Sequence, residues 1–207
     1  LKLYNWGEYM GEYLIEDFED QFDAMVIVEY FINQLKRIVR RTVSTLQEQL
    51  RHGTFRPVAF EKEFRHIYNF DQEGQVRGQL LLRGRIDRID TCEDEDNVYV
   101  KVTDYKTGRK SLDITLLYHG LQLQLMVYMD MAMQMEKKKH PGKEIVPAGV
   151  FYYHLDDPFV DKQEKETIER AILKELRPDG LINSNGEVLK HLDHTLEKDS
   201  VVIPVKY

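Results

Sequence analysis

Residues 80–108 constrain this chain more than any other stretch, because they predict two strands that end in charged residues. An acidic turn joins the strands; Asp87 lies toward the end of the first, and Asp104 and Lys106 close the second. Alternate side chains of a strand share one face, so this aspartate and lysine continue an apolar face formed by Val98, Val100 and Val102. Burying such charges is costly, so we expect them to meet a metal, a counter-charge or a substrate phosphate.

The composition bounds the class of protein. With 207 residues, 42% of them hydrophobic, the chain is large enough for one compact domain with a proper core. The net charge of -7 argues against a protein that coats nucleic acid, so any DNA contact is expected to be local, assisted by metal ions or supplied by another part of an assembly.

Three absences from the sequence set expectations about its location. No apolar run reaches the roughly 18 residues of a membrane span, and residues 1–11 do not resemble a secretory leader. The single cysteine, Cys92, is expected in the acidic turn, where it has no disulfide partner. These features indicate a protein of the cytoplasm without contact to a membrane.

A long amphipathic helix is predicted from about Asp23 to Arg51, ended by Gly53. Its polar side holds the one dense basic cluster of the sequence, which consists of Lys36, Arg37, Arg40 and Arg41. A solvated helix face explains this cluster, and so does a face that follows DNA phosphates, because a few well-placed cations bind a backbone even on an acidic protein.

The elements that follow give the order helix, three strands, buried helix, strand. Strands are predicted at residues 57–68, 79–90 and up to 106, with a turn near Gly74, and a further buried strand at 146–155. A helix over about 116–136 is apolar nearly all round and carries Gln124 and Tyr128 on one side. A helix at 165–176, a tight turn at Asn185-Gly186 and an edge strand at 201–205 complete the chain.

The acidic turn between the two charged strands invites a calcium interpretation. Residues 91–97 contain four acidic side chains, but they lack the alternating ligands, central glycine and terminal glutamate of an EF-hand loop. A solvated turn is therefore the prediction.

The blocks GRIDRID, VTDYKTG and LQLQLMVY, in this order on the expected elements, resemble the PD-(D/E)XK nuclease superfamily, and within it the RecB-like nucleases. The motifs are most similar to those of the nuclease domains of the AddB family, which belong to helicase-nucleases. The resemblance covers roughly residues 57–155 with specific motifs. It implies a restriction-endonuclease-like α/β core, a mixed sheet flanked by helices, with a C-terminal appendage of helix and strand.

The resemblance implies roles for the charged and polar residues. Asp87, Asp104 and the main-chain oxygen of Tyr105 would hold Mg²⁺, for which Mn²⁺ can substitute, and Lys106 would orient the attacking water. Gln124 and Tyr128 match the family's helical motif. The implied activity is exonucleolytic cleavage of DNA in repair and recombination, beside an AddA-like motor partner; a stand-alone Cas4-like nuclease and a silent docking module for DNA or a partner are the alternatives.

The sequence departs from the family pattern at two points. RecB-like nucleases carry a metal-binding histidine on a helix before the first strand, but residues 23–51 have none, so that ligand is expected upstream of Leu1 or absent. Glu63 is an auxiliary candidate that a surface salt bridge explains as well, and His119 is expected to cap or pack. AddB relatives use four cysteines for an iron-sulfur cluster, which Cys92 alone cannot form.

The predicted organisation is therefore one nuclease domain, expected to be a piece of a larger protein. It comprises an N-terminal helical part at 1–55, a catalytic core at 56–156 and the appendage at 157–207.

Overall fold

The computed structural model describes residues 21–72, 75–108, 110–160, 167–196 and 200–205. The chain forms two compact units, residues 1–43 and residues 44–207. The described part of the first unit belongs to helix α2, Gln21–His52, which continues into the second. This helix agrees with the predicted one. The predicted single-domain organisation is a separate matter and stays a prediction.

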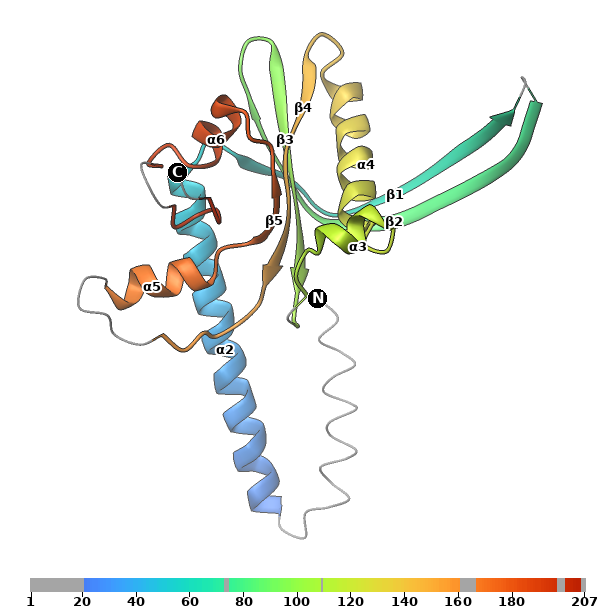
Figure 1. Cartoon of the computed structure of the whole chain (residues 1–207). Helices are drawn as coiled ribbons and strands as arrows, with labels where there is room; N and C mark the ends of the chain where they lie inside the picture. The colour runs from blue at the N-terminus through green and yellow to red at the C-terminus, as the bar shows by residue number, and fades with distance from the viewer. Residues whose placement is uncertain (1–20, 73–74, 109, 161–166, 197–199, 206–207) are drawn as a thin grey trace. The chain divides into compact units, whose positions relative to one another are not determined.

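The second unit is built on a five-stranded sheet in the order β1-β2-β3-β4-β5 (Figure 1). The strands are β1 (Arg56–Gln72), β2 (Gln75–Glu93), β3 (Asn97–Lys106), β4 (Glu144–His154) and β5 (Asp179–Ile182). β3 and β4 run parallel, and the other neighbours run antiparallel. The mixed sheet confirms the predicted fold class, including the central place of the strand at 146–155.

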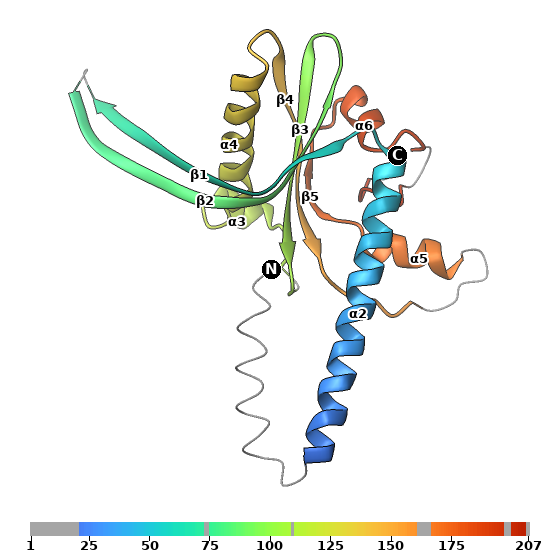
Figure 2. The ribbon, with the colours of Figure 1, turned by 180° about the vertical axis from the view of Figure 1, so that it is seen from behind.

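The ends of β1 and β2 form a ribbon of two strands. β2 pairs with β3 only over Arg88–Glu93, whereas its pairing with β1 continues to Gln75. Figure 2 shows the ribbon running beyond the other strands. The turn expected around Gly74 lies outside the described residues.

Two apolar clusters cover opposite faces of the sheet. α4 (Gln124–Lys139) packs on one face, where Val100, Val102 and Tyr152 meet Leu125 and Met129. On the other face α6 (Gly186–Leu192) and residues 201–203 pack against Tyr99 and Phe151. α5 (Ile168–Glu175) agrees with the helix predicted at 165–176, of which residues 165–166 are not described.

The predicted helix at 116–136 is two helices, α3 (Ile114–Tyr118) and α4. Gly120 has φ 74°, and the Leu121 amide donates to the Leu116 carbonyl at 2.8 Å while the Gly120 amide donates to Leu117 at 3.0 Å. This pattern is a Schellman motif, which ends a helix at a glycine. His119 is the C-cap of α3, in keeping with the capping role predicted for it.

Three further predictions about local structure were wrong. Cys92 is buried in β2 rather than in the acidic turn, and burial raises the pKa of its thiol to about 11. Asn185 caps α6 by accepting from the Glu187 amide, so Asn185-Gly186 begins a helix instead of forming a tight turn. Residues 201–205 form no strand, because the Ser200 hydroxyl accepts from the Val202 and Ile203 amides and bends the backbone.

The edge strand is β5, which the sequence did not predict. A Cβ on Gly180 would lie 2.0 Å from the Val150 carbonyl oxygen, so only glycine permits β5 to approach β4 this closely. Pro178 and Gly180 therefore mark the start of a strand as well as the end of a helix.

A buried charged network lies on the α6 face of the sheet. Asp90 accepts from Arg88 Nε at 2.6 Å and Nη2 at 2.9 Å, and pairs with Lys101 at 2.8 Å. Burial disfavours the charged form of Asp90, but Lys101 and Arg88 outweigh it and hold the pKa of this carboxyl below its usual range. The three charges satisfy one another inside the protein.

We expect Asp90→Asn to lower the free energy of unfolding by about 3–5 kcal/mol, because it leaves two buried cations without their anion. Since the folded pKa of Asp90 is lowered, its contribution is present above the ordinary carboxyl pKa of about 3.9 and is lost as the pH falls through the folded value. Urea denaturation across this range measures the loss. Asp96→Asn, in the exposed turn, is the matched control and should change stability by less than about 0.5 kcal/mol; equal effects would contradict the network.

Candidate active site

The carboxylate of Asp104 is the most deeply buried charge on the α4 face of β3. Asp104 is 2% exposed and follows Val100 and Val102 on that face, as the sequence predicted. Its Oδ2 forms an ion pair with the Lys106 ammonium, yet no described donor meets hydrogen-bond geometry at this oxygen. The strand therefore ends in a buried carboxylate whose hydrogen-bonding capacity is not filled.

Asp87 reaches the same face through an irregularity of the β1–β2 pairing. Strict alternation would put Ile86 and Ile89 on opposite faces, but both are buried in the cluster beneath α4. Opposite this point Glu61 has φ 47°, between the pairs Phe60–Arg88 and Lys62–Ile86. Such irregularities commonly redirect a side chain beside a functional site.

The peptide of Tyr105 connects the two aspartates. Its amide donates to Asp87 Oδ2 at 2.9 Å, so the residue between Asp104 and Lys106 also holds Asp87. Behind the peptide, Arg88 Nη1 donates to the Tyr105 hydroxyl at 3.3 Å, which links this position to the buried network of the other face. Neither contact was predicted, although Arg88 stands in the same GRIDRID block.

Gln124 and Tyr128 complete the site from the first turns of α4. Gln124 Nε2 lies 3.0 Å from the Tyr128 hydroxyl and 3.4 Å from Asp104 Oδ1. The break at Gly120 lets α4 begin at Gln124, so the amide of this side chain stands beside the strand end. The predicted pair thus meets one site.

An aromatic contact supports Tyr128 from the ribbon. The rings of Phe64 and Tyr128 meet edge to face with centroids 5.9 Å apart. Gly84, paired with Phe64 across the ribbon, leaves space for this ring; a Cβ there would lie 2.8 Å from it. The sequence signal for this support was only the glycine within a predicted strand.

The charge balance of the site disfavours two ionised aspartates. Burial raises the pKa of Asp104, and the charge of Asp87 adds to the effect, while Lys106 opposes both. Two carboxylates that share a buried position with one ammonium retain an excess of negative charge. A divalent cation would relieve it.

The donor set fits magnesium. Among the described residues no three His, Cys, Asp or Glu side chains gather to hold a metal ion, so Asp87 and Asp104 would bind it with a main-chain oxygen such as that of Tyr105 and with water. Mg²⁺ is typically held by one or two carboxylates and keeps several waters. The acidic turn serves another purpose, since Asp94 accepts from the amides of Asp96 and Asn97.

Two predicted auxiliary features are not part of this constellation. Glu63 is exposed, and alternation along β1 puts it on the face opposite to Phe64, which contacts Tyr128. The basic cluster Lys36, Arg37, Arg40 and Arg41 lies on α2 within the unit of residues 1–43. Its contact with DNA stays a prediction.

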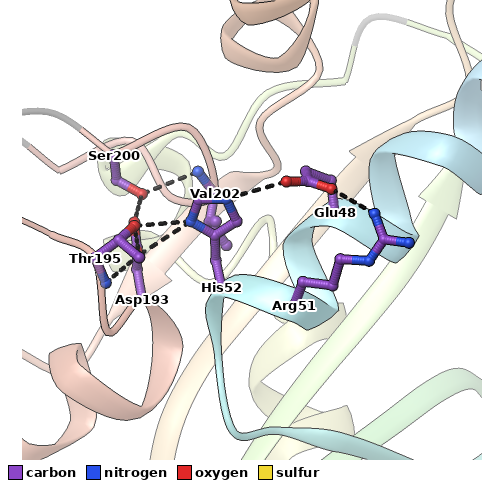
Figure 3. A network of polar contacts seen from close by, with 7 residues as sticks. All are labelled: Glu48, Arg51, His52, Asp193, Thr195, Ser200 and Val202. Atoms are coloured by element: carbon purple, nitrogen blue, oxygen red, sulfur yellow. Dashed lines mark hydrogen bonds and ion pairs between the residues drawn. The ribbon is translucent and has the colours of Figure 1, made fainter.

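The histidine at the end of α2, His52, has a structural place (Figure 3). Its Nδ1 lies 2.8 Å from the Thr195 hydroxyl and 3.5 Å from Asp193, and its Nε2 lies 3.3 Å from Glu48. The Ser200 hydroxyl donates to Asp193 at 2.5 Å. His52 thus ties α2 to the segment after α6 and does not supply the histidine ligand that the family pattern implies.

Comparison with known proteins agrees with this geometry. A mixed sheet that brings two aspartates and a lysine together beside a Gln-x-x-x-Tyr helix defines a restriction-endonuclease-like α/β domain. The chain belongs to the PD-(D/E)XK nuclease superfamily, whose family model matches residues 8–199.

The relatives that match are B-type subunits of ATP-dependent helicase/deoxyribonucleases. The chain is 43% identical over 186 residues to the one from Lachnoclostridium phytofermentans, an alignment that covers 86% of this chain and 15% of the relative. Those from Alkaliphilus metalliredigens and Clostridioides difficile are 38% and 35% identical, over 85% and 86% of this chain and 16% of each relative. The chain thus spans about a sixth of their length. Among the described residues no helix is long and apolar enough to cross a membrane.

We expect Gly84→Ala to lower the free energy of unfolding by about 1–3 kcal/mol, because the added methyl group displaces the Phe64 ring from its place beneath Tyr128. Gly142→Ala is the control, since a Cβ there meets nothing within 4 Å. Chemical denaturation of both variants checks the expectation. Equal stability of the two would mean that the Phe64–Tyr128 contact yields without cost.

Proposed function

We propose that this chain is a Mg²⁺-dependent exonuclease domain of a helicase-nuclease, acting on DNA in the cytoplasm during double-strand break repair and recombination. An AddA-like motor partner would deliver the strand, and Mn²⁺ would substitute for Mg²⁺. The observation that carries the proposal is the meeting of Asp104 with Lys106 and Gln124, beside Asp87. The names of the relatives support the substrate and the partner.

The residues of the chain have separable roles in this proposal. A divalent cation at Asp87 and Asp104 would supply positive charge to the phosphate oxygens and lower the pKa of an attacking water. Lys106 stands beside Asp104, where its ammonium would orient that water and stabilise the negative charge of the transition state. Gln124 and Tyr128 hold the carboxylate and a strand phosphate by hydrogen bonds.

The test is digestion of end-labelled single-stranded and double-stranded DNA with Mg²⁺, with Mn²⁺ and with EDTA. We expect products to shorten progressively from an end with either metal and no cleavage in EDTA. Internal cuts in a circular substrate would reject the exonuclease mode. DNA binding without cleavage in either metal would favour a silent docking module, and full activity without a motor partner would favour a stand-alone Cas4-like enzyme.

Asp104→Asn is expected to reduce cleavage at least about 1,000-fold without unfolding the protein, because it removes an anionic ligand and relieves the crowding with Asp87. In EDTA the thermal midpoint of the variant should equal or exceed that of the parent, since ionised Asp104 costs stability above its ordinary pKa. Added Mg²⁺ should raise the midpoint of the parent alone. Residual activity within a few-fold of the parent would remove Asp104 from the site.

Lys106→Met is expected to abolish turnover while metal binding persists, because an ammonium repels a cation and does not coordinate it. Removing the positive charge should leave Mg²⁺ affinity equal or higher in isothermal calorimetry. Lys190→Met, on α6, is the matched control for loss of a lysine. A loss of Mg²⁺ affinity with Lys106 would contradict this division of roles.

A further inference from the structure

A second lysine, Lys110, stands at the site beside Lys106. It lies in the loop between β3 and α3 and places its Nζ 5.3 Å from the centroid of the Tyr152 ring. The Nζ of Lys106 lies 5.4 Å from the centroid of the same ring. One aromatic side chain therefore attracts both ammonium groups through its π-electrons.

Tyr152 links this ring to the reacting end of β3. It is 0% exposed on β4 and is the direct partner of Asp104 in the parallel pairing of the two strands. Its hydroxyl is buried and has no hydrogen-bond partner among the described residues. What Tyr152 offers to its surroundings is thus the ring, which forms part of the floor beneath Asp104 and Lys106.

The loop that carries Lys110 is fixed to the neighbouring strands. The Lys110 carbonyl lies 2.9 Å from His154 Nε2, which donates to it in the tautomer protonated at that nitrogen. The Leu112 amide donates to Asp179 Oδ2 on β5 at 2.6 Å, and Asp113 caps α3 through the amides of Thr115 and Leu116. These contacts hold the lysine at the site.

The two lysines differ in how their charges are balanced. Lys106 is neutralised by Asp104 and is partly buried, whereas Lys110 is exposed and pairs with no carboxylate among the described residues. The charge of Lys110 still reaches the site, where it acts to lower the pKa of Asp104 against the larger effect of burial. Holding a second cation beside the first is unfavourable unless an anion joins them.

We propose that Lys110 is a phosphate-binding residue of this site, which contacts a backbone phosphate adjacent to the one that is cut. The inference rests on the proposed function. Lys106 acts at the scissile phosphate, and Lys110 fixes the register of the strand by neutralising the neighbouring phosphate.

The test compares Lys110→Gln, Lys110→Arg and the control Lys190→Gln, whose lysine pairs with Glu187 on α6. Binding of a fluorescein-labelled single-stranded oligonucleotide is measured by anisotropy in Ca²⁺ over a series of KCl concentrations. Each phosphate neutralised by a lysine contributes about 0.7 to the slope of log affinity against log salt for single strands. Lys110→Gln should lower this slope by about that amount and weaken binding about fivefold at low salt, while Lys110→Arg and Lys190→Gln keep the parent's slope.

Cleavage kinetics in Mg²⁺ separate phosphate binding from other roles. The loss in Lys110→Gln should fall on KM more than on kcat, since a contact outside the reacting phosphate acts in the ground state and the transition state alike. An unchanged slope and affinity would overturn the proposal. So would a fall in kcat at unchanged KM and slope, because Lys110 would then act only by positioning Lys106.

The same experiment distinguishes failure of the nuclease proposal from failure of this one. If the parent binds DNA but cleaves none in Mg²⁺ or Mn²⁺, a lowered slope in Lys110→Gln still supports the phosphate contact while the nuclease assignment fails. If the parent cleaves and the slope is unchanged, the nuclease assignment stands and the contact of Lys110 is rejected.

Discussion

The buried carboxylate of Asp104 sets the requirement that the rest of the site meets. A charge that is 2% exposed is tolerated only with partners, and this one has an ammonium, a side-chain amide and a second carboxylate around it. The first two stabilise the charge and the third opposes it. The arrangement keeps a net demand for positive charge at the end of β3, which is what a site for a divalent cation and a phosphate needs.

The strands that carry this site carry a second charged system on their other face. Arg88 and Asp90 alternate with Asp87 and Ile89 along β2, and Lys101 joins them from β3. This network is closed, because its charges satisfy one another, whereas the site around Asp104 is left open. The Tyr105 hydroxyl accepts from Arg88 while the Tyr105 amide donates to Asp87, so the closed network holds the peptide on which the open site depends.

The sequence predicted the elements of the site because each rests on a local pattern. Alternation placed Asp104 and Lys106 on the apolar face of β3, and a spacing of four placed Gln124 and Tyr128 on one side of a helix. The position of Asp87 depended on more than alternation, since an irregular pairing opposite Glu61 turns it toward α4. Arg88, Phe64 and Lys110 gave no local signal, because their partners are distant in sequence and only the tertiary fold brings them near.

The errors in the local structure have a common cause, which is that one residue type satisfies more than one backbone geometry. Asn185 accepts an amide as readily at a helix N-cap as in a turn, and Gly180 permits a close approach of strands as well as a helix end. Tertiary contacts chose between these outcomes. The valine-rich residues 201–203 similarly satisfy the apolar demand of the α6 face while Ser200 takes their amide hydrogens, so burial alone did not make them a strand.

The break between α3 and α4 shows how such a local choice determines the chemistry. A continuous helix over 116–136 would have Gln124 within its middle turns, where its side chain competes with neighbours for the core. Ending α3 at Gly120 and starting α4 at Gln124 frees the chain to return to the strand end before the second helix begins. The same short helix α3 is capped by Asp113, which fixes the end of the loop that bears Lys110. The glycine that stops α3 therefore places both the amide that meets Asp104 and the loop that brings a second lysine to the site.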